Sequence, residues 1–336
     1  MILISVIIPC RNEKLHISNC VNSLVQSTLP TDQFEILVVD GMSDDGTREV
    51  VADLCKLFPN VELLDNTMQL TPYAFNIGII RSRGKYVLIT GARNVLQPNY
   101  MQACIAKLEA DKRIKCVGGV MHSTYGNETG KCIAIAMSSP IGVGFGNFRA
   151  IEQDAFTDTA AVPVYDKTIF EEVGMFDEEL TRNQDDEFNF RLTRKGYKIL
   201  VTADTYSTYQ VRGTFYNLWR QYFQYGYFKV YVNKKHRHIT TYRQLAPAAL
   251  IMYLFLGLLF ALLFHSLRNL YFLSVAIYLI IVISFSFYKT KRITKALRVA
   301  YAIWILHAAY GLGYLKGIFD FIVLSKKINI DQKLSR

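Results

Sequence analysis

The first 125 residues alternate short apolar runs with longer segments of helical periodicity. Apolar runs that predict strands lie at 4–10, 34–40, 61–65, 86–90 and 116–121. Segments that predict helices, two of them with a proline near their start, lie at 16–28, 45–58, 71–83 and 98–112. This alternation predicts an α/β domain with a mostly parallel sheet covered by helices on both faces. In such sheets, ligands bind at the carboxyl ends of the strands.

Beyond residue 244 the pattern changes to long uncharged segments. Leu245–Phe264 carries no charged residue in 20 positions, and Leu270–Tyr288 carries none in 19. Each is close to the ~20 residues that cross about 30 Å of hydrocarbon, so both predict spanning helices rather than buried soluble ones. A third apolar segment, Val299–Leu324, is interrupted by polar residues, and it could span, re-enter or lie on the membrane surface.

The placement of lysine and arginine predicts how the chain lies in the membrane. Five basic residues precede the first span and five lie between the second and third segments, whereas only Arg268 lies between the first two. We therefore expect a domain at 1–240 on the cytoplasmic face of the inner membrane, with an interfacial helix at 212–240, and a multi-pass membrane domain at 245–324. The basic C-terminal tail also prefers the cytoplasm, which favours two spans and a re-entrant or interfacial third segment.

The composition narrows the classes of partner. A formal net charge of +10 is compatible with nucleic acid, an anionic membrane or an anionic substrate. No dense stripe of lysine and arginine with a nucleic-acid-binding signature is present, so no nucleic-acid partner is expected. The six cysteines show no C-x-x-C spacing and predict reduced, mostly buried thiols. The apolar start has no basic segment before it and no cleavage site after it, which predicts a first strand and not a signal peptide.

Two polar loops follow predicted strands, one in VIIPCRNE (6–13) and one in VVDGMSDDGT (38–47). An ordinary polar loop and a helix cap explain several of these residues, Asp45 among them. They do not explain Asp40, which ends its strand where a carboxylate can bind a base N–H or ribose hydroxyls. The absence of G-x-G-x-x-G argues against a dinucleotide loop. Both loops are therefore candidates for a ligand site at one edge of the sheet.

Three consecutive acids, Asp185, Asp186 and Glu187, precede a segment, EFNFRL, that predicts a packed helix. The N-terminus of a helix favours a nearby negative charge. This explanation covers one of the three acids, because three adjacent carboxylates repel one another. The other two are candidates for a functional role.

Together these motifs resemble the opening of family-2 glycosyltransferases of the GT-A fold, in which P-x-x-N-E follows the first strand and S-x-D-G-T follows an Asp that ends the second. The resemblance covers about residues 1–240 and continues into the spans. It is closer to the succinoglycan-biosynthesis branch of membrane-associated bacterial enzymes, on QYFQYG at 221–226 and SSPIGVG at 138–144. It implies that the two loops and AFNIGI contact the nucleotide of a sugar donor through Pro9, Arg11, Asn12, Glu13, Asp40, Asp45 and Asn76.

The resemblance also implies roles for the later motifs. A carboxylate takes the proton of the acceptor hydroxyl in this chemistry. The family's E-D pair falls on Gln184 and Asp185, so Asp185 would be the base, with Asp186 as the second candidate. The family's Q-x-x-R-W motif closes over donor and acceptor. It falls on an aromatic-rich segment that also fits a core or membrane-interface helix, and Gln221, Gln224 and Tyr225 occupy its frame while its Arg and Trp are replaced.

The family's metal motif is missing from this chain. After its fourth strand the family has Asp-x-Asp, or Asp-Ala-His in this branch, to hold Mg²⁺ or Mn²⁺. Here Gly91-Ala92-Arg93 stands in its place, and neither Gly91 nor Arg93 can ligate a hard cation through a side chain. Arg93 could stabilise the diphosphate in the metal's place, other acids could hold a metal, or donor binding could be lost. A solvated loop arginine is the remaining interpretation, so the cofactor stays undetermined.

These implications predict an inverting glycosyltransferase of the hexosyltransferase type. It would move a sugar from a nucleotide donor, expected to be a UDP-sugar, to a polyprenyl-diphosphate-linked glycan at the cytoplasmic membrane face, for exopolysaccharide or capsule synthesis. The alternative is a non-catalytic membrane subunit of a polysaccharide assembly complex. A processive synthase is disfavoured by the few spans and the altered Q-x-x-R-W frame. A homo-oligomer or a partner transferase is compatible with either reading.

Overall fold

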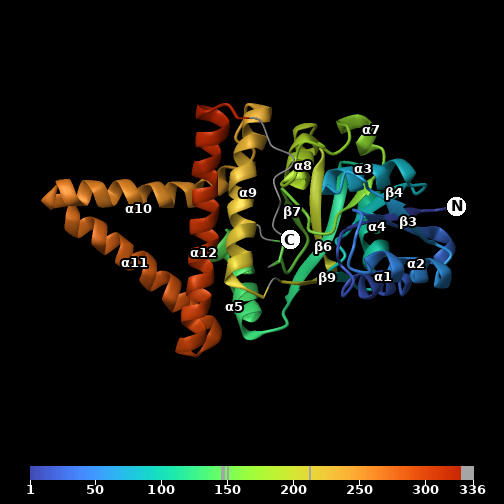
Figure 1. Ribbon diagram of the computed structural model, residues 1–336, viewed down its shortest axis with the longest axis horizontal. Helices are drawn as coiled ribbons and strands as arrows, with labels where there is room; N and C mark the ends of the chain where they lie inside the picture. The colour runs from blue at the N-terminus through green and yellow to red at the C-terminus, as the bar shows by residue number, and fades with distance from the viewer. Residues whose placement is uncertain (145–147, 150, 212, 327–336) are drawn as a thin grey trace. The chain divides into compact units, whose positions relative to one another are not determined.

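The computed structural model of the chain describes residues 1–144, 148–149, 151–211 and 213–326 (Figure 1). These residues form two compact units. Of the described residues, the first unit comprises 1–123, 148–149 and 151–210, and the second comprises 124–144, 211 and 213–326. By its contacts, the segment expected to form an interfacial helix therefore packs with the C-terminal helices. The assignment of residues 1–240 to one catalytic domain stays a prediction.

The first unit is built on a mixed sheet. Its parallel part has the order β3 (Val61–Asp65), β2 (Phe34–Asp40), β1 (Ile4–Cys10) and β4 (Tyr86–Ile89). The sheet continues through β8 (Val164–Asp166), β6 (Ile114–Thr124), β9 (Lys198–Gln210) and β5 (Asn94–Leu96), with β7 (Ala155–Thr157) paired to β9. β8 is antiparallel to β4 and to β6, so the parallel order predicted from the sequence holds for the first four strands only.

Helices cover both faces of this sheet, as the sequence pattern predicts. The four predicted helices are present as α1 (Ile17–Val25), α2 (Thr47–Leu57), α3 (Thr71–Arg81) and α4 (Tyr100–Ala110). Side chains of α1, α2 and α4 pack in one core cluster, and those of α3, α7 (Ile169–Val173) and α8 (Gln184–Arg194) pack in another.

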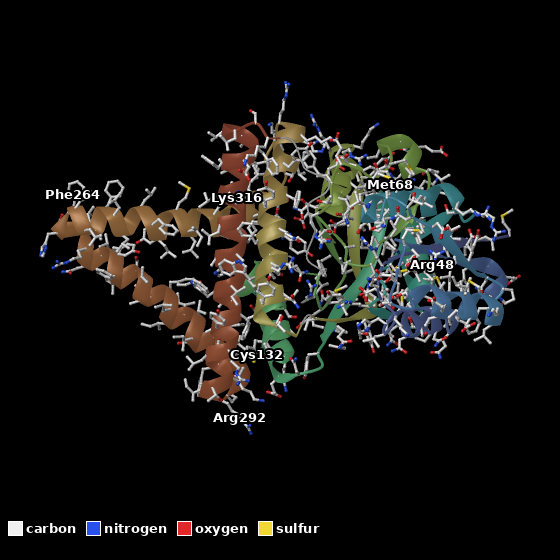
Figure 2. All side chains as sticks on the ribbon, in the orientation of Figure 1. Arg48, Met68, Cys132, Phe264, Arg292 and Lys316 are labelled. Carbon is white, nitrogen blue, oxygen red and sulfur yellow. The ribbon has the colours of Figure 1, made fainter. Side chains whose placement is uncertain are left out.

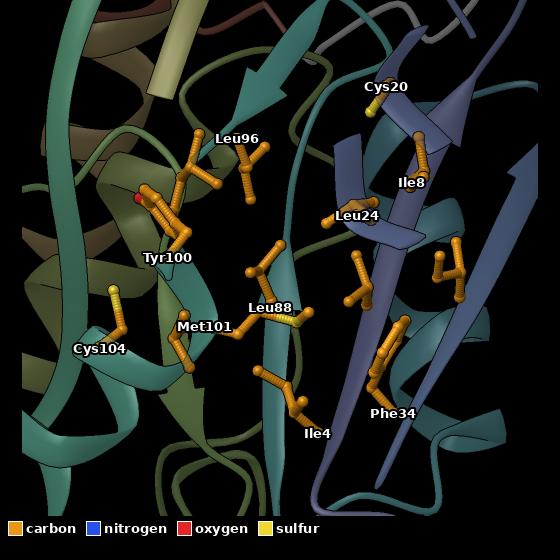
Figure 3. Packing of buried hydrophobic residues seen from close by; sticks show 14 of the residues in the cluster. Ile4, Ile8, Cys20, Leu24, Phe34, Leu88, Leu96, Tyr100, Met101 and Cys104 are labelled. Atoms are coloured by element: carbon orange, nitrogen blue, oxygen red, sulfur yellow. The ribbon is translucent and has the colours of Figure 1, made fainter. Parts of the chain in front are cut away.

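Alternation along β1 assigns its side chains to the two clusters. Ile4 and Ile8 belong to the first cluster, whereas Ile7 belongs to the second. Figure 3 shows Ile4 and Ile8 among labelled side chains of α1, β2 and β4. The second face is packed so closely that a Cβ on Gly78 of α3 would lie 2.5 Å from Cγ2 of Ile7. The central strands are therefore buried on both sides, which fixes where their carboxyl ends lie.

All six cysteines are free, and only Cys55 is not fully buried. Burial raises the pKa of Cys20 to about 12. Cys20 and Cys104 lie among apolar side chains in Figure 3. The prediction of reduced, mostly buried thiols is confirmed, and these thiols pack as small apolar groups.

A buried carboxylate ties the amino ends of the central strands together. Glu35 of β2 accepts hydrogen bonds from Ser5 Oγ at 2.6 Å and from the backbone N–H of Arg83 at 2.7 Å. The guanidinium of Arg83 adds an ion pair at 2.6 Å. Burial alone would raise the pKa of Glu35, but the bonds from Ser5 and Arg83 outweigh it and lower this pKa.

We expect Glu35→Gln to lower the free energy of unfolding by about 1–3 kcal/mol at pH 7, because it removes charge-assisted bonds to a buried group. A lowered folded-state pKa stabilises the fold above the unfolded pKa of about 4.3, and this stabilisation is lost as the pH falls through the folded value. Urea unfolding at pH 7 and at acidic pH tests this. The difference between the wild-type chain and the variant should shrink as the pH drops below about 4, and a constant difference would contradict it.

The second unit consists of helices. They are α5 (Glu128–Met137), α6 (Pro140–Val143), α9 (Phe215–His236), α10 (Ala246–Leu263), α11 (His265–Thr290) and α12 (Ile293–Gly317), with short turns η2 (Tyr242–Leu245) and η3 (Ile318–Val323). In Figure 1, α9 runs beside α12, while α10 and α11 leave them as a hairpin. Phe264 marks the tip of this hairpin in Figure 2.

Within the part of the chain that the structure describes, three helices are long and apolar enough to cross a membrane: Tyr242–Leu263, His265–Thr290 and Ile293–Val323. Their most apolar windows are 17%, 17% and 67% buried within the protein. The hairpin helices thus expose apolar surface as spanning helices do. The third segment is helical without interruption from Ile293 to Gly317, so no re-entrant turn occurs inside that range.

Residues that interrupt the apolar pattern of α12 are its contact points. A Cβ on Gly313 would lie 2.1 Å from the carbonyl oxygen of Phe223, which shows how closely α12 approaches α9. His307 Nε2 donates to the carbonyl of Ile141 at 2.8 Å, and Tyr278 OH donates to Nδ1 at 2.9 Å. α12 is therefore fastened to α6, α9 and α11.

Candidate active site

The two polar loops predicted from the sequence meet at the carboxyl ends of β1 and β2. Cys10 and Asp40, the last residues of these strands, are paired in register. The backbone N–H of Asn12 donates to Ser43 Oγ at 2.8 Å, and that of Glu13 donates to Thr47 Oγ1 at 2.9 Å. These bonds fasten the two loops into one surface at the sheet edge where α/β proteins bind ligands.

The amide of Asn12 adds a reciprocal pair of bonds. Asn12 Nδ2 donates to Asp44 Oδ1 at 2.8 Å, and the backbone N–H of Asp44 donates to Asn12 Oδ1 at 3.1 Å. Asn12 adopts a left-handed backbone with φ of 56°, which asparagine tolerates better than most residues. The family's Asn therefore shapes the paired loops here, and a contact with the nucleotide remains a prediction.

Asp40 is fully buried and its hydrogen bonds come from the protein. It accepts from the backbone N–H of Ser43 at 2.8 Å, from Ser43 Oγ at 2.5 Å and from Arg48 Nη1 at 3.0 Å. Its side chain is 0% exposed. The carboxylate thus holds the loop and the guanidinium in place, and a nucleotide reaches it only after some of these bonds are exchanged.

Arg48 is a site residue that the sequence analysis missed. It bridges Asp40 at 3.0 Å and Asp65, the last residue of β3, at 2.8 Å. The sequence could have indicated it. A basic residue in the first turn of a helix is unfavourable to the helix dipole, so a nearby acidic partner is expected. Arg48 thus offsets the charge of two carboxylates beside the predicted nucleotide loop.

Asp45 acts as a cap for α2. Its Oδ1 accepts from the backbone N–H of Thr47 at 2.9 Å and from Thr47 Oγ1 at 2.5 Å. Slight burial acts to raise the pKa of Asp45, but the bonds from Thr47 lower it on balance. Gly46, with φ of +93°, completes the turn in a conformation that favours glycine. The helix-cap interpretation thus accounts for Asp45, whose contact with a nucleotide stays a prediction.

Arg93 lies at the same edge, beyond β4, and is bound to the first loop. Its Nε donates to both carboxylate oxygens of Glu13, at 3.1 and 2.9 Å. The Arg93 side chain is 33% exposed and that of Glu13 is 19% exposed. Its terminal nitrogens make no hydrogen bond to the residues that the structure describes. Arg93 is therefore a fixed side chain of the site and not a freely solvated one.

The residues at this position do not fit a hard divalent cation. Gly91 has no side chain, Arg93 is cationic, and Glu13 is held by Arg93. Within the described ranges, no group of three or more His, Cys, Asp or Glu side chains is placed to hold a metal ion. Packing does not forbid an acid, because a Cβ on Gly91 would have only Asn94 Nδ2 near it, at 3.7 Å.

The three consecutive acids begin α8 and lie in different environments. Glu187 is buried and pairs with Arg191 at 2.8 Å. Arg191 also donates to the carbonyls of Val173 and Met175, which ties α8 to the end of α7. Asp185 is exposed and Asp186 is intermediate. Glu187 thus has a structural role, and Asp185 and Asp186 lie nearer the surface of the first unit.

Asn76 has a bracing role. Its Nδ2 donates to the carbonyl of Phe176 and to Glu178 Oε1, both at 2.9 Å. The backbone N–H of Phe176 returns a bond to Asn76 Oδ1 at 3.0 Å. Asn76 is 6% exposed, so this buried amide secures the loop that leads to α8. A direct nucleotide contact by Asn76 was predicted from the resemblance, and the hydrogen bonds point to support of that loop.

The remaining predicted residues lie in two places. Pro9 is within β1 and pairs with Val39, while Arg11 packs its side chain 3.2 Å from the Cβ position of Gly41. Gln221 and Tyr225 lie on α9 of the second unit, where Gln221 Nε2 donates to Tyr225 OH at 2.9 Å. Gln224 lies on the same helix. Closure of these three residues over donor and acceptor remains a prediction.

Comparison with known sequences identifies relatives of this site. Residues 5–174 match the family model described as glycosyl transferase family 2. A curated relative from Methanococcus voltae, dolichyl N-acetyl-alpha-D-glucosaminyl phosphate 3-beta-D-2,3-diacetamido-2,3-dideoxy-beta-D-glucuronosyltransferase, is 29% identical over 233 residues, which are 67% of this chain and 72% of the relative. The succinoglycan biosynthesis protein ExoA of Rhizobium meliloti is 28% identical over 249 residues, covering 73% and 74%.

A solved structure confirms the fold. The mannosyltransferase PcManGT from Pyrobaculum calidifontis, solved with GDP-Man and Mn²⁺, aligns with a TM-score of 0.68 and 20% identity, covering 94% of this chain and 87% of that one. The predicted resemblance to GT-A glycosyltransferases and to the succinoglycan-biosynthesis branch is confirmed. At this identity the structural likeness carries the fold alone.

Proposed function

Because the chain belongs to glycosyl transferase family 2, we propose that it transfers a sugar from a nucleotide-sugar donor to a hydroxyl of a lipid-linked saccharide, with inversion at the anomeric carbon. The observation that carries this proposal is the joined surface at the ends of β1, β2 and β4. It combines the paired loops of Asn12 and Ser43 with the guanidinium of Arg93, which Glu13 holds through Nε alone. Such a surface suits an anionic nucleotide diphosphate. We expect a UDP-sugar as the donor.

Arg93 would stabilise the departing diphosphate. Glu13 holds its Nε, which leaves the outer edge of the guanidinium available for phosphate oxygens. A fixed cation in place before the reaction lowers the barrier wherever negative charge develops. PcManGT was solved with Mn²⁺, and a divalent cation held by other groups is the alternative. The side chains present at 91–93 favour Arg93, and no step here depends on a metal.

Asp185 would act as the general base. As the acceptor oxygen bonds to the anomeric carbon on one face, the bond to the diphosphate oxygen breaks on the other, and the hydroxyl proton passes to the carboxylate. Asp185 is exposed in the first turn of a helix that Glu187 and Arg191 hold in place. Asp186, one residue further along α8, is the second candidate.

The acceptor would be a polyprenyl-diphosphate-linked glycan at the cytoplasmic membrane face. The Methanococcus relative is named for a dolichyl-phosphate-linked N-acetylglucosamine, and ExoA for succinoglycan biosynthesis. The apolar hairpin of α10 and α11 would keep the protein at the membrane, where such lipids are concentrated. Exopolysaccharide or capsule synthesis is the process we infer.

A transfer assay tests the proposal. The purified full chain is incubated with a panel of UDP- and GDP-sugars and a prenyl-diphosphate-linked N-acetylglucosamine, and the product is analysed by mass spectrometry and NMR. We expect one added sugar whose anomeric configuration is opposite to that of the donor. Retention of configuration would contradict the inverting mechanism.

The missing acids at 91–93 favour one competing function, that of a non-catalytic membrane subunit with a transferase fold. Binding of a nucleotide without transfer to any acceptor of the panel would support that alternative.

A further inference from the structure

A cavity of about 640 Å³ lies in the second unit, between the last turn of α9 and the turn η3. This volume is within the range of about 300–1,000 Å³ that is typical of small-molecule sites. Three basic side chains line it: Lys234, Arg237 and His238. None of the described residues that line it is acidic.

The rest of the wall is apolar or aromatic. Val230, Ile239, Ile318 and Ile322 contribute to it, together with Tyr242 and Tyr314. Ile322 is 55% exposed and Tyr242 is 67% exposed, so apolar surface continues outward from the cavity. The cavity thus joins a cationic part to an apolar path, which is the complement of an amphiphile with an anionic head.

Hydrogen bonds of Asn233 and Lys234 hold the backbone around the basic residues in place. Asn233 Nδ2 donates to Tyr314 OH at 3.1 Å, and Asn233 Oδ1 accepts from the backbone N–H and the hydroxyl of Thr240, both at 3.0 Å. Lys234 Nζ donates to the carbonyl of Phe321 at 2.5 Å. These bonds fix Thr240 to α9, and they fix the last turns of α9 to α12 and η3, so the basic side chains are presented from a defined surface.

The neighbouring charges do not cancel this positive field. Asp320 in η3 accepts from Lys316 and Lys326, both at 2.9 Å, so two cations already offset its charge. The carbonyls at the end of α9 are partly satisfied, because the backbone N–H of Arg237 donates to Lys234 O and that of His238 donates to Asn233 O. An anion placed at Lys234 and Arg237 therefore meets net positive charge.

We propose that this cavity binds the phosphate headgroup of a lipid, with the hydrocarbon chain along Ile318 and Ile322. The membrane position supports a lipid over a soluble phosphate compound, because one candidate spanning helix begins at Tyr242 and another ends at Val323. The phosphate is bound by Lys234 and Arg237, whose donors are charged. Its lining residues belong to the second unit, whereas the predicted donor site belongs to the first, and occupancy of the cavity does not require sugar transfer.

Binding of farnesyl phosphate to the purified full chain tests this proposal, with inorganic phosphate and farnesol as head-only and chain-only probes. We expect farnesyl phosphate to bind at least about tenfold more tightly than either probe. Lys234→Gln and Arg237→Gln should each weaken its binding about tenfold or more. Ile322→Trp, which fills the apolar path without changing charge, should also weaken it.

Arg292→Gln is the matched control. Arg292 is exposed, does not line the cavity and lies at the opposite end of α12 from Lys316 (Figure 2). Its removal should leave the affinity unchanged. Equal affinities of the wild-type chain, Lys234→Gln and Arg237→Gln would overturn the proposal, and so would inorganic phosphate or farnesol binding as tightly as farnesyl phosphate. No nucleotide sugar is present, so failure here is distinct from failure of the proposed transferase reaction.

Discussion

Asp185→Asn is expected to lower the rate of sugar transfer by about 10²–10⁴-fold, because an amide cannot take the proton from the acceptor hydroxyl. Asparagine keeps the size of the side chain, and the pair of Glu187 with Arg191 and the bond from Arg191 to Val173 remain in the variant. The affinity for the nucleotide should therefore stay within about threefold of the wild-type value. Rates with saturating donor and acceptor, compared with donor affinity by calorimetry, measure the two effects separately.

Asp186→Asn is the matched control for this prediction. It makes the same chemical change one residue further along α8, and we expect it to lower the rate less than about tenfold. The reverse result, a large loss in Asp186→Asn and a small one in Asp185→Asn, would move the base to Asp186. Full activity in both variants would exclude these carboxylates as the base.

Arg93→Gln is expected to weaken the binding of nucleoside diphosphates by about 10–100-fold in the presence of EDTA. The variant loses charge-assisted hydrogen bonds to phosphate, each of which contributes about 1.5–3 kcal/mol. It also leaves the carboxylate of Glu13 without its partner, which adds repulsion toward the diphosphate. Calorimetric titration with UDP gives the affinity, and the transfer assay should show a loss of rate in the same variant.

Arg83→Gln is the control for a general effect of removing an arginine–glutamate pair. Arg83 binds Glu35 at the amino end of the same strands, far along the sheet from their carboxyl ends. This variant should lose stability and keep its affinity for UDP. A similar loss of affinity in both variants would show that Arg93 acts through the fold and would contradict its proposed contact with phosphate.

The sequence pattern predicted the alternating strands and helices of the first 110 residues, which include β1 to β4 and α1 to α4. Strand ends at Cys10 and Asp40 implied two adjacent loops, and the bonds from Asn12 and Glu13 to the second loop bear this out. The same reasoning could not detect β8, because three residues inserted antiparallel between β4 and β6 leave no periodicity of their own.

A local sequence pattern also cannot predict contacts between segments that lie far apart in the sequence. Residues 124–144 pack with the C-terminal helices, where Lys295 pairs with Glu128 at 2.6 Å across a large sequence separation. Glycines and His307 in α12 looked like interruptions of a span, whereas they are contacts with α9 and α6. Whether a polar residue breaks a helix or fastens it depends on a partner that its own segment does not contain.

The candidate site shows the same limit at the level of side chains. The sequence identified Asp40, Asp45 and Asn76 as residue types suited to binding, but it did not show which bonds they already make. Asp40 accepts hydrogen bonds from Ser43 and Arg48, and Asp45 accepts one from Thr47. Asn76 accepts one from the backbone N–H of Phe176. The sequence also left open whether Arg93 is a site residue or a solvated loop residue. The structure shows that it is bound to Glu13 of the first loop.

The most direct test of the central claim is calorimetric titration of UDP and UDP-sugars into the purified full chain, first with Mn²⁺ and then with EDTA. The account predicts binding that persists in EDTA, because the terminal nitrogens of Arg93 can donate to phosphate oxygens without a metal. Binding that requires Mn²⁺ would contradict the role of Arg93 and show that other side chains hold a metal. No binding of any nucleotide in either condition would contradict the transferase itself.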